Sequence, residues 1–243
     1  VVSENANMQM RGNWDVSGFN SGTGNCVSIQ NSTIQSDAST DIYSNESSGH
    51  IIIGPGTTLN AGTSGAGRIY MRSDLGNIQI GSTLSTANRT SLTTAGGDID
   101  LYAPTLGVQL NKTDLASNGG RIGAGGGYSV QAGFPVQSSA GTGLQILNGT
   151  RIDAGTGNVN LQGSTTQGNG IAVQDAVALG GELHLEGTTS GTGSGIRIDN
   201  AALTSNGNLY ARGHVTDSGN GSGVSIQSAN ILSQGGGVFI LGG

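Results

Sequence analysis

The sequence predicts an all-β fold, a right-handed parallel β-helix (solenoid) of about nine rungs with three short strands in each. Three observations lead to it: an excess of glycine, a small apolar content, and an internal repeat. Of the 243 residues, 46 are Gly and 3 are Pro, and hydrophobic residues make up 34%. Such a chain needs a fold in which few side chains per residue point into the core, and its glycines belong in tight corners.

Each repeat opens with two apolar residues in alternation. The opening residues are Val27, Ile51, Ile78, Val108, Leu144, Ile171, Ile196 and Val224, spaced by 24 to 36 residues. A period of two is typical of a strand, and turns rich in Gly, Asn and Ser follow each one. Because so short a strand cannot bury its apolar face alone, successive repeats are expected to stack in register.

Two further strands follow in each repeat. The second is expected at Ile152, at Val177 and Leu179, at Leu203 and at Ile231. The third carries the alternating pairs Val159/Leu161, Leu183/Leu185, Leu209/Ala211 and Val238/Ile240. Three strands per repeat without any helical pattern favour a parallel β-helix, and the right-handed rule for parallel crossovers sets its hand.

The whole chain, residues 1–243, is predicted to be one solenoid segment and an internal piece of a longer protein. The widest gap between repeats contains the glycine-rich run 123–127. We therefore expect an irregular insertion around residues 123–143. No composition shift or charged run indicates a linker.

A polar ladder is expected at one corner of the solenoid. Four residues after the first apolar residue of a repeat lie Asn31, Ser82, Asn148, Asp175, Asn200 and Ser228. A small residue follows each of them: Ser32, Thr83, Gly149, Ala176, Ala201 and Ala229. Side-chain amides stacked in this way are expected to bond between rungs. Pro55 and Lys112 interrupt the column.

Composition excludes several functions. The net charge is −6 with 9 basic residues, which argues against a nucleic-acid partner. No apolar run approaches the ~20 residues of a membrane span. The single Cys26 excludes a disulfide framework within the chain, and the three His residues lack the spacing of metal ligands. We expect no cofactor, no metal and no catalytic residue.

Stacking predicts two groups of outward side chains, and each has two interpretations. Arg68, Asp98 and Arg121 share one column, with Asp100 beside them. They form either a ladder of opposite charges or a carbohydrate-cleaving or calcium site.

Glu186 is expected over Arg212 in the second group. His184 is expected between Asn160 and Tyr210, followed by Phe239. The aromatic residues of this group either pack across rungs or form a stacking platform for a glycan.

The segments AGGDIDLYA (95–103) and LASNGGRI (115–122) resemble the repeats of filamentous-haemagglutinin-like exoproteins. These are large secreted proteins of Gram-negative bacteria. The resemblance implies a right-handed β-helical shaft, export through an outer-membrane transporter of the two-partner type, and a role in adhesion or contact-dependent toxin delivery.

These observations lead to a structural and adhesive shaft of a secreted or cell-surface exoprotein. The shaft projects a distal binding or effector region toward a glycan or receptor on a host or neighbouring cell. One alternative is a β-helix that cleaves or binds polysaccharide. A second is an extracellular fibre subunit that associates end to end.

Overall fold

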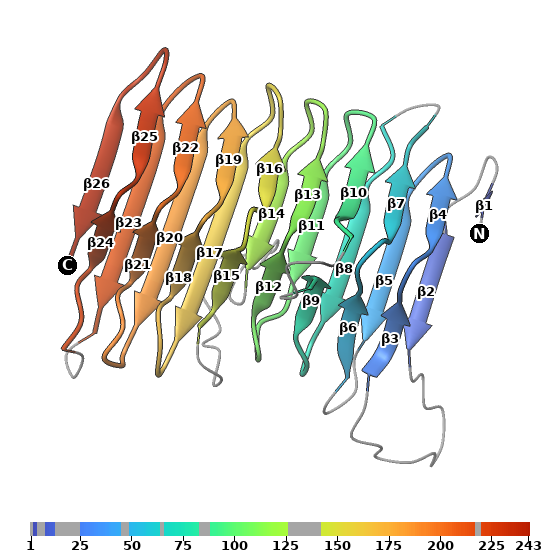
Figure 1. The fold of residues 1–243 in the computed structure, drawn as a ribbon, viewed down its shortest axis with the longest axis horizontal. Helices are drawn as coiled ribbons and strands as arrows, with labels where there is room; N and C mark the ends of the chain where they lie inside the picture. Colours follow the sequence, from blue (N-terminus) through green and yellow to red (C-terminus); the bar gives the residue numbers. More distant parts are fainter. Residues whose placement is uncertain are drawn as a thin grey trace.

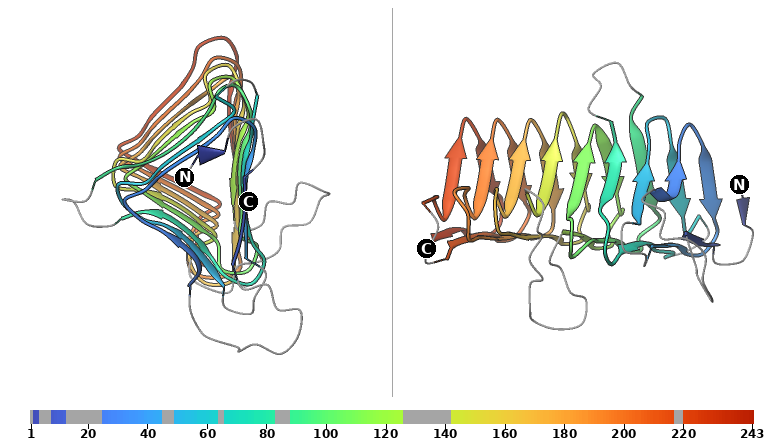
Figure 2. Two further views of the ribbon diagram at one scale, coloured as in Figure 1. Left: turned by 90° about the vertical axis from the view of Figure 1, so that its right-hand side faces the viewer. Right: turned by 90° about the horizontal axis from the view of Figure 1, so that it is seen from below.

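The computed structural model describes residues 2–3, 8–12, 25–44, 49–63, 66–82, 88–125, 142–216 and 220–243. Over these residues the chain is an all-β solenoid with a triangular outline, and each turn adds one strand to each of three parallel sheets (Figures 1 and 2). The predicted fold class is confirmed. Among the described residues, two sheets contain nine strands and one contains eight. No helix in this part of the chain is long and apolar enough to cross a membrane.

The chain passes through the three sheets in the order C, A, B in every turn. Sheet C contains β3 (Asn25–Ile29), β6 (His50–Ile53), β9 (Ile78–Gly81), β12 (Val108–Asn111), β15 (Leu144–Leu147), β18 (Ile171–Gln174), β21 (Ile196–Asp199) and β24 (Val224–Gln227).

Sheet A contains β1 (Val2–Ser3), β4 (Thr33–Ser36), β7 (Thr58–Ala61), β10 (Thr90–Thr94), β13 (Thr113–Ala116), β16 (Arg151–Asp153), β19 (Val177–Gly180), β22 (Ala202–Ser205) and β25 (Asn230–Ser233). Sheet B contains β2 (Met8–Gly12), β5 (Thr40–Ser44), β8 (Ile69–Ser73), β11 (Ile99–Tyr102), β14 (Ile122–Gly125), β17 (Val159–Thr165), β20 (Leu183–Thr189), β23 (Leu209–Val215) and β26 (Val238–Gly242).

The predicted register of sheet C is confirmed along its whole length. Val27 pairs with Ile51, and the pairing continues through each predicted opening residue to Val224. Ile51, Ile78 and Ile171 are fully buried in the core cluster of the described residues. Only alternate residues of short strands point into this core, which is why a chain with so few apolar residues can fill it.

The expectation for the second strand was wrong in one turn. Register pairs Ile152 with Ala178, and Ala178 with Leu203, so Ala178 is the inward residue of β19. Val177 is 37% exposed, and Leu179 is only partly buried. The inward positions of the neighbouring strands decide the register, since a shift by one residue would reverse every side chain of β19.

The predicted insertion is only partly covered by the structure. Its first residues, 123–125, belong to the regular strand β14, which pairs with β11 and β17. Residues 126–141 lie outside the described part of the chain.

The corner between sheets C and A is a column of left-handed backbone. Residues with positive φ include five of the six predicted ladder residues: Asn31, Asn148, Asp175, Asn200 and Ser228, with φ between 46° and 55°. Lys112, expected to interrupt the column, has the same conformation with φ 49°. Asn and Asp adopt this region more readily than most side chains, so the backbone explains their presence at the corner.

The side-chain amides of this corner form hydrogen bonds between turns in two places. Asn200 Nδ2 donates to Asp175 Oδ1 at 2.5 Å, which links two rungs of the expected ladder. Asn148 Nδ2 donates instead to Asn111 Oδ1 at 2.8 Å, one position away from the column. Asn31, Asn148, Asn200 and Ser228 are exposed, so this ladder lies on the surface.

A buried threonine column, which the repeat pattern did not reveal, lies beside this corner. Thr57, Thr90, Thr113 and Thr150 are all fully buried. Each hydroxyl donates to a carbonyl oxygen of the preceding turn, which belongs to Ile29, Gly54, Ile80 and Leu110 respectively, at 2.9 to 3.3 Å. These bonds tie each turn to the one before it.

The corner between sheets A and B requires glycine for a different reason. A Cβ added to Gly97 would lie 2.1 Å from the carbonyl oxygen of Gly67, and one added to Gly120 would lie 2.2 Å from that of Gly97. Gly157 repeats the contact with Gly120 at 1.9 Å. Turns approach so closely here that no side chain fits between them.

Candidate functional site

The outer face of sheet B carries the predicted surface residues. Alternate residues of its strands point outward, so each turn places at least two side chains on this face. One column contains Asp41, Tyr70, Asp100, Gly123, Asn160, His184, Tyr210 and Phe239, and the next contains Tyr43, Arg72, Tyr102, Gly125, Gln162, Glu186, Arg212 and Leu241. Gly123 and Gly125 present no side chain, so β14 divides the face into a charged half and an aromatic half.

Ion pairs connect successive turns in the charged half. The Arg121 Nη2 atom lies 2.9 Å from both carboxylate oxygens of Asp100 and 3.6 Å from Asp98 Oδ2. Asp98 Oδ1 also accepts the backbone N–H of Arg121 at 2.8 Å. The structure therefore brings Asp98, Asp100 and Arg121 together.

Arg68, predicted to join this column, pairs with the preceding turn instead. Its Nε lies 3.2 Å from Asp41 Oδ1. Its guanidinium also lies 5.2 Å from the centre of the Tyr70 ring, a cation–π contact. Asp41 was missed because it stands two positions after the expected column, in the next outward column of the sheet.

Burial affects one carboxylate of this cluster. The Asp100 side chain is only 8% exposed, and desolvation raises the pKa of its carboxyl. The charge of Arg121 acts in the opposite direction, while the charge of Asp98 adds to the effect of burial. A carboxylate held on both oxygens by an arginine is poorly placed to bind a cation or to attack a substrate, which supports the interpretation as a charge ladder.

No group of three or more His, Cys, Asp or Glu side chains suited to a metal ion lies among the described residues. The pair Asp98 and Asp100 alone offers too few oxygens for calcium, which takes six to eight.

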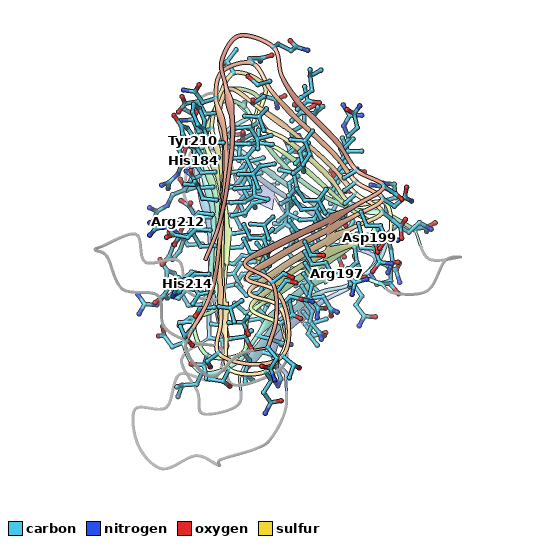
Figure 3. All side chains as sticks on the ribbon, turned by 90° about the vertical axis from the view of Figure 1, so that its left-hand side faces the viewer. His184, Arg197, Asp199, Tyr210, Arg212 and His214 are labelled. Atoms are coloured by element: carbon cyan, nitrogen blue, oxygen red, sulfur yellow. The ribbon has the colours of Figure 1, made fainter. Side chains whose placement is uncertain are left out.

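The aromatic half contains a stack of three rings. The ring centres of His184 and Tyr210 are 4.7 Å apart, and those of Tyr210 and Phe239 are 5.0 Å apart with an interplanar angle of 11°. Figure 3 views the molecule along the solenoid, with His184 and Tyr210 superposed and Arg212 and His214 farther along the same sheet. The ring spacing is close to the ~4.8 Å rise of one turn, so the rings of successive turns stack, with an angle of 29° between His184 and Tyr210.

A groove follows this stack. It has a volume of about 380 Å³ and is lined by Asn160, Leu161, Gln162, His184, Leu185, Glu186, Tyr210, Ala211, Arg212, Phe239 and Leu241. Gln162 Nε2 donates to Glu186 Oε2 at 3.4 Å, and His184 Nε2 lies 3.5 Å from Glu182 Oε2. All six residues of the second predicted group therefore line one groove: Asn160, His184, Glu186, Tyr210, Arg212 and Phe239.

The stacked geometry bears on the predicted glycan platform. A sugar that packs on an aromatic ring needs an open ring face. Both faces of Tyr210 are covered, by His184 and by Phe239. Tyr210, the inner ring of this stack, thus presents its edge to the groove.

No protein family model, curated protein or solved structure matches the chain.

Proposed function

We propose that this chain is a structural and adhesive shaft segment of a large bacterial exoprotein, secreted or held at the cell surface, without catalytic activity. The observation that carries the proposal is the constant register of sheet C, in which each turn repeats the one before it. A uniform solenoid is compatible with a spacer whose length depends only on the number of its turns.

The mechanism is geometric. Each turn advances the chain by about 4.8 Å, and the nine strands described in sheet A span eight intervals, or roughly 38 Å. Further turns of the same kind would lengthen the rod without any change in its cross-section. A region at the far end is thereby held away from the cell, where it can reach a glycan or receptor on another cell.

The charged half of sheet B supports a structural role for its carboxylates. Asp41 and Asp100, the two most buried acids of this face, each pair with an arginine of the following turn. Pairs of this kind hold adjacent turns in register. Export through an outer-membrane transporter belongs to the same proposal and is supported by the resemblance of the repeats.

Electron microscopy of the full-length gene product tests the proposal. The producing cells are fractionated, and an antibody raised against residues 142–243 is used for gold labelling. We expect label on the cell surface or in the medium, on rods of constant width. Label confined to the cytoplasm, or a compact particle in place of a rod, would contradict the shaft. Release of products from a purified polysaccharide by this chain would contradict the absence of catalysis.

A further inference from the structure

The groove on β17, β20, β23 and β26 has two walls of different chemistry. The ring wall consists of Asn160, His184, Tyr210 and Phe239. The opposite wall consists of the non-aromatic side chains Gln162, Glu186, Arg212 and Leu241. Each wall contributes one side chain per turn, so the groove runs parallel to the solenoid axis. The side chain of His184, on the interior strand β20, is 44% exposed, which leaves the groove open along its outer side.

The width of the groove follows from strand geometry. Facing wall residues are two positions apart on one strand, which places their Cβ atoms about 6.6 Å apart. A flat molecule in contact with both walls needs two van der Waals layers of ~3.5 Å each, or about 7 Å. A puckered sugar ring is thicker than one layer of atoms and does not fit this spacing. The dimensions therefore select a planar ligand.

The described part of the groove covers four turns. Three intervals of ~4.8 Å give a length of at least about 14 Å, enough for three linked rings in a row. The ring wall favours such a ligand electrostatically. Aromatic edges carry partial positive charge, and aromatic faces carry partial negative charge. A planar conjugated molecule standing in the groove presents its negative face to the positive edges of His184, Tyr210 and Phe239.

The charges on the opposite wall balance one another. Glu186 and Arg212 occupy adjacent turns, and Gln162 donates a hydrogen bond to Glu186. A ligand without net charge is thus preferred. We propose that this groove binds an elongated, uncharged, planar aromatic molecule of at least three rings, with its long axis parallel to the solenoid. The site is separate from the adhesive end that the shaft would project.

The probe for the test is 2-(4-methylaminophenyl)benzothiazole, a flat and uncharged fluorescent molecule of three rings. Fluorescence titration of the purified chain is expected to show saturable binding with one molecule per chain. Tyr210→Ala removes the central ring of the wall, and we expect binding about three- to tenfold weaker, the effect of one lost aromatic contact.

Tyr70→Ala is the matched control, because Tyr70 occupies the same outward column in the charged half of the sheet. It is expected to bind the probe like the unmodified chain. Circular dichroism melting of both variants verifies that the solenoid remains folded. Glu186→Ala, which opens the opposite wall, gives a second reading if Tyr210→Ala does not fold.

Three results would overturn the proposal. The first is the absence of saturable binding. The second is binding that Tyr210→Ala and Glu186→Ala both leave unchanged. The third is preferential binding of cellotetraose, a linear sugar, which would show that the groove accepts a thicker ligand.

Discussion

Hydroxyl groups at the corner of sheets C and A determine how one turn is held on the next. Thr113 is fully buried, and its hydroxyl lies 3.1 Å from the carbonyl oxygen of Ile80 in the preceding turn and 3.0 Å from that of Asn111. The same contact recurs at Thr57, Thr90 and Thr150. In a solenoid with a thin core, such bonds add stability where apolar contacts are few.

Thr113→Val keeps the shape of the side chain and removes the donor. We expect a loss of about 1 kcal/mol in the free energy of unfolding, the typical net contribution of one buried hydrogen bond. Thr93→Val, on the outer side of β10, is the control and is expected to change stability by less than about 0.5 kcal/mol. Urea denaturation measures both. Equal losses in the two variants would show that the buried hydroxyl has no special role.

Asp100 makes stability depend on pH in the direction opposite to that of most carboxylates. Burial raises its folded pKa above the ordinary ~3.9 of the unfolded chain, so the native state binds this proton more tightly. The contribution of Asp100 is therefore greatest at low pH and is lost as pH rises through the folded pKa.

Asp100→Asn removes this dependence while keeping a hydrogen-bond acceptor for Arg121. We expect the gain in stability from pH 4 to pH 7, measured by urea denaturation, to be larger in the variant than in the unmodified chain. A smaller or equal gain would mean that pairing with Arg121 outweighs burial.

At the scale of the strand, the sequence pattern predicted the inward residues correctly wherever only one of the two alternating sets of residues is apolar. The opening strands alternate clearly, as in Ile51 and Ile53, and their register was predicted correctly throughout. β19 has the sequence Val-Ala-Leu, in which both alternating sets are apolar. The larger residues, Val177 and Leu179, were predicted to face the core, but Ala178 does so. Neighbouring strands fix its register, and that information lies in residues about 25 positions away.

The varying length of the turns between sheets C and A caused a second error of prediction. The column of small residues was counted at a fixed distance from each opening residue, which placed Gly149 in it. The turn after β15 is one residue longer than those after β12 and β18, so Thr150 takes the buried position and Gly149 is exposed.

The surface groups on sheet B were predicted because the stacking of turns alone brings their residues together. The orientation of the rings and the pairing of Arg68 with Asp41 depend on side-chain packing that periodicity does not encode.

An experiment can show which residues of β19 face the core. Leu179→Ala removes a side chain from the outer face, and we expect it to cost less than about 1 kcal/mol. Leu203→Ala, on the inward position of the adjacent strand β22, is expected to cost about 2–5 kcal/mol, as for other buried leucines. Thermal or urea unfolding of both variants gives the comparison. A larger loss from Leu179→Ala would place Leu179 in the core.

At the scale of the whole molecule, one turn should be removable without loss of the fold. Ile171 and Ile196 are register partners, and each follows a glycine, so deletion of residues 171–195 joins Gly170 to Ile196 in the same geometry. We expect this variant to unfold cooperatively and to keep the β-sheet circular dichroism of the full chain. Deletion of residues 171–182 removes only β18 and β19 and is expected to prevent folding of the last turns. Failure of the whole-turn deletion alone would contradict a solenoid of interchangeable turns.

The central claim is that one turn stacks on the next at a constant rise, and spin-label distances test it most directly. In a Cys26→Ser background, Ser28 is labelled together with Gln109, Ala172, Arg197 or Ser225, all in one outward column of sheet C. These partners are three, five, six and seven turns away, so pulsed electron resonance should give distances near 14, 24, 29 and 34 Å at ~4.8 Å per turn. Distances that rise linearly in this series support the rod. A series that levels off or reverses would contradict it.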